Sequence, residues 1–311
     1  ADPMGATLKK DYPQVEEFAR IYASDGSKLV RKGAEYINEA RIVYADSTLF
    51  SVFSFPAISG DTRVALNEPN SMVITESGAR KYFGTTDVIG RMIEVKDDKT
   101  TLYKVNAVIR DLPRNSHFHF DLFLSMDNVD YNFGTYLSHN FHTYLLLKPG
   151  SDPKELEKQF PVFTEKYVLP QAAAFMEIKS MKEFEKAGNK LNYSLMPLVD
   201  IHLKSARFPE LDVNGRMEYV WIFSAVAFFI LLLACINFMN LSTARSAGRA
   251  REVGIRKVMG TDRASLVFQF IAESVLMVSI SLLIAILIIW LVLPWFNNLA
   301  AKELRITELF R

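Results

Sequence analysis

Four histidines lie close together in this 311-residue chain and are its first candidates for chemistry. They are His117, His119, His139 and His142, and on a β-strand His117 and His119 would point to the same face. Two imidazoles on one face, with Asp121 nearby, could bind zinc or copper. The cluster has no thiolate ligand and no second pair at fixed spacing, so ordinary polar chemistry is favoured and no metal or other cofactor is expected.

Other reactive arrangements do not stand out. No grouping of Ser, His and Asp, or of Cys and His, specifies nucleophilic catalysis. No G-x-x-x-x-G-K-[ST] loop occurs, so the chain does not bind ATP through such a loop. The formal net charge is +1, and no nucleic-acid partner is expected. We therefore expect a chain that is not itself an enzyme.

Two long uncharged segments indicate a membrane protein. Residues 219–244 and 274–301 contain no charged side chain, and each holds about the 20 apolar residues that a bilayer-spanning helix needs. Trp221 near one end of the first segment, and Trp290 and Trp295 near the end of the second, suit the aromatic belts of a membrane interface.

The stretch between these segments is basic. Residues 241–263 carry six Lys and Arg against two Asp and Glu, an excess that predicts a cytoplasmic loop. Residues 1–218 carry 27 Lys and Arg against 30 Asp and Glu, and would lie on the opposite side of the membrane. The chain opens with no apolar leader, so we expect an upstream membrane helix to precede it.

A helix over residues 241–259 would place basic side chains together. Arg245, Arg249, Glu252 and Arg256 would share one face, and Gly260 could end the helix. An apolar patch would face elsewhere, formed by Ile255, Val258 and Met259. Such a helix could rest on anionic membrane lipids, or it could be a docking element for a cytoplasmic partner.

Three polar residues lie within or beside the spans. Glu273 lies near the cytoplasmic end of the second span, where it could reach the interface, pair with a loop arginine or contact a second copy. A substrate or proton role is the alternative. Asn237 and Asn240 would either bond between helices or shape a docking site.

Residues 1–218 read as a mixed α+β domain. Thr75 is expected to cap a helix that ends at Gly84, and Asp46 or Ser47 to cap another. Alternation predicts strands at residues 118–125 and 193–202. A helix is expected over residues 152–167, capped by Ser151 or Asp152 with Pro153 in its first turn, and another over residues 172–186.

Several strings resemble one family. NFMNLSTARSAGRAREVGIRKVMGTDRASLVFQFIAESVL is similar to the corresponding block of MacB/FtsX-type ABC transporter permeases. YADSTLFSVFSFPAISGD, LNEPNSMVITESGARKYFG and VIRDLPRNSHFHFDLFLSM resemble the family's periplasmic core domain. The family has an E-[IV]-G-[IV]-R-[KR] run between its second and third membrane helices, and here that run reads EVGIRK.

The resemblance implies an α+β periplasmic domain (MacB-like periplasmic core domain) followed by two transmembrane α-helices. The expected parts are a periplasmic domain with stalk at 1–218, spans at 219–241 and 265–294, a coupling loop at 242–264 and a tail at 295–311. The family's first and fourth membrane helices would be absent. Residues implied in ATPase coupling are Glu252, Val253, Gly254, Ile255, Arg256, Lys257, Val258, Met259 and Gly260.

The resemblance also implies function. The chain would be a non-catalytic permease subunit in the bacterial inner membrane, paired with a second permease copy or half and driven by a separate ABC ATPase. Movement of the periplasmic domain would serve efflux of a peptide, lipid-linked molecule or drug, and a periplasmic partner is plausible.

Two alternatives stay open. One is activation of a cell-wall hydrolase, although members with that role have smaller outer domains. The other is a membrane-tethered sensor or binding module without an ATPase, against which the EVGIRK run argues.

Overall fold

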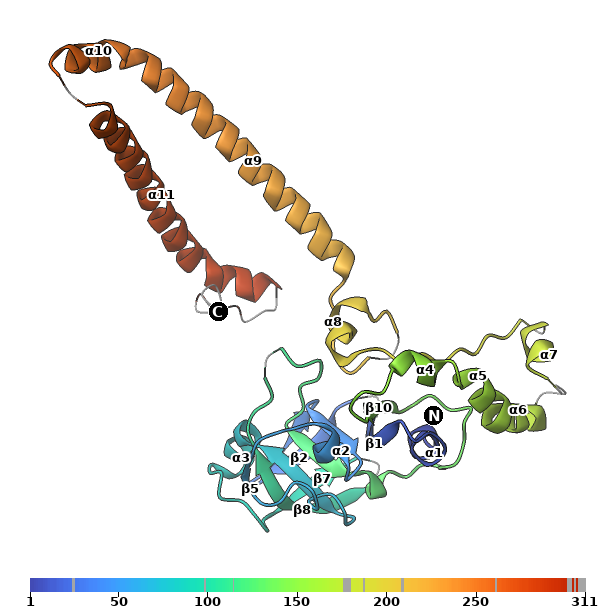
Figure 1. The fold of residues 1–311 in the computed structure, drawn as a ribbon. Helices are drawn as coiled ribbons and strands as arrows, with labels where there is room; N and C mark the ends of the chain where they lie inside the picture. The colour runs from blue at the N-terminus through green and yellow to red at the C-terminus, as the bar shows by residue number, and fades with distance from the viewer. Residues whose placement is uncertain are drawn as a thin grey trace. The chain divides into compact units, whose positions relative to one another are not determined.

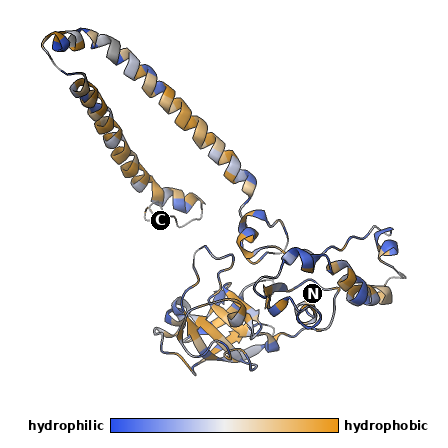
Figure 2. Ribbon diagram, viewed as in Figure 1, coloured by the Kyte–Doolittle hydropathy of each residue, from blue (hydrophilic) through white to orange (hydrophobic). Residues whose placement is uncertain are grey.

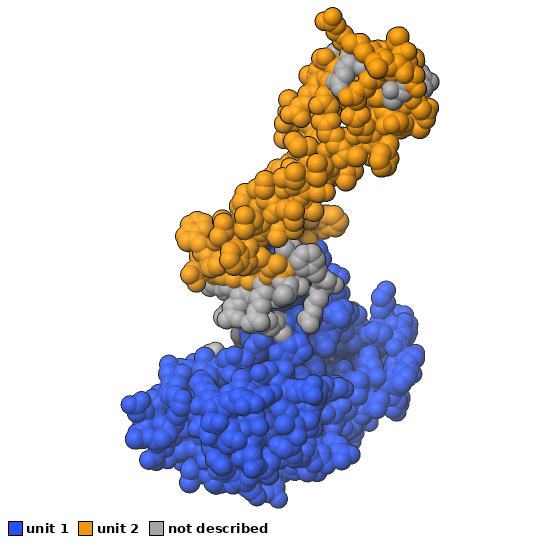
Figure 3. Space-filling model, turned by 90° about the vertical axis from the view of Figure 1, so that its left-hand side faces the viewer, with its two compact units in different colours: residues 1–219 blue, residues 220–311 orange. Residues whose placement is uncertain are grey.

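The computed structural model describes residues 1–23, 26–97, 99–113, 115–175, 180–186, 188–207, 210–260 and 262–300, together with Leu304 and Ile306. The chain divides into two compact units, Ala1–Tyr219 and Val220–Arg311, coloured separately in Figure 3.

A mixed β-sheet forms the centre of the first unit (Figure 1). Its strands run in the order β10-β1-β4-β9-β6-β8-β7-β2-β3, and β5 pairs with β8. Pairs β4–β9 and β6–β8 are parallel, and the other described pairs are antiparallel. The bounds are β1 Val15–Tyr22, β2 Lys28–Lys32, β3 Glu35–Glu39, β4 Ile42–Ala45, β5 Ala57–Ser59, β6 Ser71–Thr75, β7 Met92–Lys96, β8 Thr100–Ile109, β9 Leu122–Ser125 and β10 His142–Leu147.

Short helices surround this sheet and continue the chain beyond it. They are α1 Met4–Asp11, α2 Leu49–Val52, α3 Glu76–Phe83, α4 Pro153–Glu157, α5 Phe160–Phe163, α6 Leu169–Phe175, α7 Met181–Lys186 and α8 Ile201–Lys204. A π-helical turn spans Thr164–Val168, and 3₁₀ turns span Met126–Asn128 and Leu198–Asp200.

The two faces of the sheet bury separate hydrophobic clusters. Because side chains alternate along a strand, β6 sends Met72 and Ile74 into cluster 1 and Val73 into cluster 2. Helix α3 contributes Ala79 and Tyr82 to cluster 1. Cluster 2 is completed by residues of α2 and of the segment before β9, namely Leu49, Phe50, Phe118 and Phe120. Cluster 3 lies under α1, α4 and α5.

The expectations for α3 and α4 are confirmed. The Thr75 hydroxyl accepts a hydrogen bond from the Gly78 amide, and Gly84 ends α3 with φ 74°. Asp152 caps α4, with its carboxylate accepting from the Lys154 amide. The expected helix over residues 152–167 is instead divided into α4, α5 and the π-helical turn, because Pro161 lacks an amide and starts a new helix.

Three local expectations are wrong. Neither Asp46 nor Ser47 caps α2, which has Thr48 at that position, and the Asp46 carboxylate binds Arg20 instead. The strand expected at 118–125 begins only at Leu122, since Phe118 and Phe120 insert into cluster 2 before the chain joins the sheet.

The third error is the strand expected at 193–202. The described residues there form a loop, a 3₁₀ turn and α8. Tyr193 and Leu195 do share a face, but that face packs on cluster 3, and the Leu195 amide donates to the Glu157 side chain and not to a strand. The helix expected over residues 172–186 is observed in two parts, since residues 172–175 belong to α6 and residues 181–186 form α7. Residues 176–179 lie outside the described part.

The described residues of the second unit form α9 Met217–Gly248, whose first turn precedes the unit, α10 Ala250–Val258 and α11 Arg263–Ala300. Met217–Arg245 and Ala264–Ala300 are long and apolar enough to cross a membrane, and Figure 2 shows hydrophobic residues along most of α9 and α11. Helix α11 continues through Pro294 to Ala300. The polar residues concentrate at α10 and its two flanking turns.

Candidate functional site

Helix α10 is a separate short helix between the two apolar ones. Helix α9 ends at Gly248, a poor helix former, and α10 begins at Ala250, with Arg249 (φ −92°, ψ 0°) between the two helices. Gly260 follows α10 with φ 88°, a left-handed conformation that glycine adopts without strain. The expectation that Gly260 ends this helix is therefore confirmed.

The expectation of one continuous helix over residues 241–259 is wrong. Because the chain bends at Arg249, Arg245 belongs to α9 while Arg256 belongs to α10, and the four charged residues do not share one helical face. Glu252 lies in α10, but its side chain is outside the described part.

One face of α10 is fastened to the beginning of α11. The Arg249 guanidinium donates from Nη1 to Glu273 Oε2 at 2.6 Å and from Nη2 to Oε1 at 3.0 Å. Such a two-bond pairing fixes orientation as well as distance. Arg256 Nη1 donates to Gln269 Oε1 at 2.8 Å. Glu273 therefore pairs with a loop arginine, one of the roles suggested for it from the sequence.

The spacing of these contacts defines the inner face of α10. Residues 249, 253 and 256 recur at helical intervals, and half-buried Val253 lies between the two arginines. Residues Gln269 and Glu273 are one turn apart on α11. Two polar contacts, one near each end of α10, thus hold the helix against α11.

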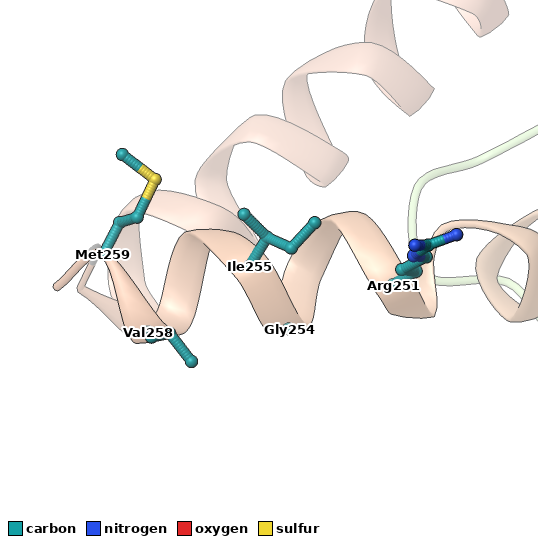
Figure 4. A pocket seen from close by; sticks show the side chains of 5 residues that line it. All are labelled: Arg251, Gly254, Ile255, Val258 and Met259. Atoms are coloured by element: carbon teal, nitrogen blue, oxygen red, sulfur yellow. The ribbon is translucent and has the colours of Figure 1, made fainter.

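The outer face of α10 is apolar and exposed. Figure 4 shows the residues that line a shallow pocket of about 450 Å³ there, Arg251, Gly254, Ile255, Val258 and Met259. They lie about half a turn from the inner face. Val258 is 89% exposed and Met259 80% exposed, and contiguous exposed apolar side chains are typical of a contact with a protein or a membrane.

No contact within the described part of the chain requires a glycine at position 254. A Cβ atom added there would meet no other described atom within 4 Å, and its backbone is ordinary helix. Glycine inside a helix costs about 0.5–1 kcal/mol relative to alanine. Its place at the centre of the outer face suits close approach by another backbone.

The remaining predicted site residues are dispersed. Lys257 is exposed beside the outer face. Asn237 and Asn240 lie on α9, exposed, and neither has a hydrogen bond to another described residue through its side chain. Of the residues predicted from the sequence, the hydrogen bonds bring together Arg249, Arg256 and Glu273. Gln269, which binds Arg256, and Arg251, which lines the outer face, were not predicted. The spacing of Gln269 four residues before Glu273 could have identified it.

The histidines bind different partners and do not converge. His117 Nε2 lies 2.7 Å from the Tyr144 hydroxyl, while His119 Nδ1 lies 2.7 Å from Asp212 Oδ2. His139 stacks on Tyr193. Among the described residues, no three His, Cys, Asp or Glu side chains gather closely enough to hold a metal ion.

Burial lowers the pKa of three of these histidines, His117, His139 and His142. Burial, with smaller contributions from His142 and His119, lowers the pKa of His117 to about 4. Burial also lowers the pKa of His142, an effect that Glu210 opposes. The His117 imidazole is therefore neutral at pH 7.

Two family descriptions match this chain. The MacB-like periplasmic core domain matches residues 1–161, and the FtsX-like permease C-terminal domain matches residues 224–309. The ABC transporter permease YvrN of Bacillus subtilis (strain 168) is 31% identical over 108 residues. That alignment covers 35% of this chain and 24% of YvrN, so the chain matches about a quarter of that permease.

Three solved structures are similar to this chain. A domain of a permease protein from Porphyromonas gingivalis has a TM-score of 0.46 and 20% identity, covering 54% of this chain and 77% of its own. The periplasmic region of MacB from Actinobacillus actinomycetemcomitans has a TM-score of 0.40 and 13% identity, covering 60% and 82%. The extracellular domain of YknZ, a noncanonic ABC-type transporter from Gram-positive bacteria, has a TM-score of 0.38 and 14% identity, covering 63% and 89%.

Loss of the Glu273 carboxylate should loosen α10. In Glu273→Gln, the ionic contact with Arg249 is lost, and backbone amides of α10 should exchange hydrogen faster by a small factor, since solvent screens a half-exposed pair of this kind. Hydrogen–deuterium exchange of the chain in nanodiscs measures this. Lys257→Gln, which removes a charge from the exposed flank, is the control. Equal exchange in Glu273→Gln and wild type would show that the pair does not hold the helix.

The pKa of His117 predicts a pH-dependent stability. Because its folded pKa lies below the ordinary value of 6.5, the unfolded chain binds more protons between pH 6.5 and 4. The Tm of the first unit should therefore fall as pH falls through this window and level off below it. His117→Gln should flatten the slope, whereas the control His202→Gln, at an exposed site, should not. An unchanged slope in His117→Gln would contradict the assignment.

Proposed function

Because the chain belongs to the MacB/FtsX-type ABC transporter permeases, we propose that it couples ATP hydrolysis by a separate ATPase subunit to movement of its periplasmic domain. The chain would be the non-catalytic membrane subunit. The family generally works with an ATPase and as a dimer, so a second permease copy or half is proposed as the other partner.

The two-faced structure of α10 carries this proposal. Its inner face is held to α11 by Arg249 and Arg256, so force applied to α10 reaches an apolar helix directly. Its outer face carries the exposed side chains of Val258 and Met259 close to Gly254. A Cβ atom added at Gly254 would meet no described atom within 4 Å. An exposed apolar face of this kind is what a docking element for a cytoplasmic protein needs.

The charge distribution supports one orientation of the chain across the membrane. The basic residues of 241–263 favour the cytoplasmic side, where a nucleotide-hydrolysing subunit would be. The first unit would then lie in the periplasm, with α9 and α11 in the inner membrane. Arg251 and Lys257 would also lie close enough to anionic lipid headgroups to bind them.

The side-chain amides of Asn237 and Asn240 suit contacts within the membrane assembly. A side-chain amide without a hydrogen-bond partner in an apolar environment is unfavourable. The two asparagine side chains are therefore expected to face other helices, where they can form hydrogen bonds. We assign them to contacts with a second copy or with further helices of the complete permease.

Export is proposed as the purpose of the movement, with a peptide, lipid-linked or drug-like molecule as cargo and a periplasmic protein as a further partner. This part rests on family membership, and no described pocket selects among the cargoes.

Substitution at Gly254 tests the docking face. In a complex reconstituted with the partner ATPase subunit, Gly254→Trp should weaken assembly by at least about tenfold, because its side chain would hold the partner away from α10. Gly254→Ala should assemble more nearly like wild type, since it adds one methyl group and favours the helix.

Arg256→Glu should assemble yet lose stimulation of ATP hydrolysis, because it breaks the contact with Gln269. ATPase rate and co-purification are the measurements. If wild type neither binds nor modulates the ATPase, or if Gly254→Trp behaves as wild type, the coupling assignment fails and a sensor or binding module becomes the better interpretation.

A further inference from the structure

We propose that the first unit contacts the surface of the lipid bilayer through Leu198, Val199 and Val213, here called the interfacial patch. Leu198 and Val199 belong to the 3₁₀ turn Leu198–Asp200, and Val213 precedes α9. The inference goes beyond coupling to an ATPase. It needs only that α9 crosses the membrane, which the proposed function also assumes.

The interfacial patch is highly exposed for apolar side chains. Among the described residues of the first unit, Val199 at 87% and Val213 at 85% are the two most exposed large apolar side chains, and Leu198 is 48% exposed. Single exposed apolar residues are ordinary on a protein surface, whereas several on neighbouring segments indicate contact with a protein or a membrane. The place of the patch in the chain decides between these two.

The beginning of α9 marks the level of the membrane surface. Residues 219–244 carry no charge and would span about 39 Å as a helix, more than the hydrocarbon core of about 30 Å. Tyr219 and Trp221 are exposed aromatic residues of the kind that membrane interfaces favour. The charged residues Arg216 and Glu218 come just before them. The first turn of α9 therefore lies in the headgroup layer.

Both parts of the patch lie close to this level. Val213 is four residues before Met217, the first residue of α9, so even an extended chain would place it at most about 14 Å away. Helix α8 is also near, because a Cβ atom added at Gly215 would lie 3.1 Å from the Leu203 side chain, a contact within the first unit. The 3₁₀ turn that carries Leu198 and Val199 leads directly into α8.

The patch is apolar in character because charges beside it have local partners. The pairs are Asp200 with Lys204 at 2.9 Å, Asp212 with His119 at 2.7 Å and Arg216 with Glu218 at 3.4 Å. A surface element binds a membrane through buried apolar area and through attraction of unpaired basic residues to anionic lipid. Here the first of these supplies the contact, so it should depend little on salt or on the charge of the lipid.

The bilayer is the occupant that the chain itself brings to the patch. Three side chains would not hold a free domain on a membrane. Because α9 already fixes the neighbouring residues at the bilayer, the contact forms within one molecule, and even a weak apolar contact is then populated. Lipid surrounds α9 in every state of the protein, whereas a second protein would have to be recruited.

Fluorescence quenching by nitroxide lipids tests the contact. The full chain, in a Cys235→Ser background, is labelled with NBD at Val199→Cys or Val213→Cys in nanodiscs of phosphatidylethanolamine and phosphatidylglycerol with a headgroup nitroxide lipid. Both labels should be quenched at least about twofold more strongly than a label at Leu102→Cys, an exposed position on β8. Quenching no stronger than at Leu102→Cys would overturn the proposal, because lipid would then not surround the patch.

Substitution at Val199 tests whether apolar side chains make the contact. Val199→Asp should reduce by about half the quenching of a label at Val213→Cys, because a carboxylate disfavours insertion, whereas Val199→Leu should preserve it. Since Val199 is so exposed, neither change should alter the Tm of the first unit. Quenching should be equal at low and high salt. Quenching that falls with salt, or that Val199→Asp leaves unchanged, would contradict an apolar contact.

Tryptophan emission separates failure of this proposal from failure of the proposed function. The three tryptophans, Trp221, Trp290 and Trp295, all lie in α9 and α11, so quenching of their emission by acyl-chain nitroxides reports insertion of these helices. Quenched tryptophans with unquenched patch labels would overturn the interfacial patch alone. Unquenched tryptophans would overturn the membrane assignment on which both proposals depend.

Discussion

The paired hydrogen bonds between Arg249 and Glu273 determine how the second unit can act. A carboxylate on an otherwise apolar helix is unfavourable unless it is paired, and Arg249 meets both of its oxygens. This pairing fixes the rotation of α10 relative to α11. Once the inner face is fixed, Val258 and Met259 must face away from α11, because they lie about half a turn around the same helix.

The first unit imposes a similar constraint through its sheet. Successive residues of β6 enter two different hydrophobic clusters, so the sheet is covered on both faces and behaves as a rigid layer. Phe118 and Phe120 anchor the adjacent segment to that layer, and His119 projects between them toward Asp212. A sheet packed on both faces suits a domain that moves as a body. This is the behaviour that a permease of the proposed type requires.

The sequence allowed prediction of features that depend on neighbouring residues. Thr75, Gly84 and Asp152 act as helix ends because capping involves residues only a few positions apart. The apolar helices were evident from the absence of charge alone. The candidate site was predicted in part: the EVGIRK run marked α10, and Glu273 was assigned a loop arginine as one possible partner.

Features set by distant contacts were not predictable in this way. Residues 193–202 alternate as a strand would, yet their partner is cluster 3. The break between α9 and α10 coincides with Gly248, which is visible locally, whereas the contact of Arg249 with Glu273 joins residues 24 positions apart. His117 and His119 looked like a metal pair because their actual partners, Tyr144 and Asp212, lie far away in the sequence.

We propose that α10 has one face held by the chain and one face free for the ATPase. Maleimide labelling of Val258→Cys, in a Cys235→Ser background and in nanodiscs, tests it most directly, with Lys257→Cys on the flank as the comparison. We predict rapid labelling of Val258→Cys in the chain alone and at least about tenfold slower labelling once the ATPase is added, with a smaller change at Lys257→Cys. Slow labelling of Val258→Cys before the ATPase is added would place this face on lipid, and equal labelling with and without the ATPase would contradict the claim.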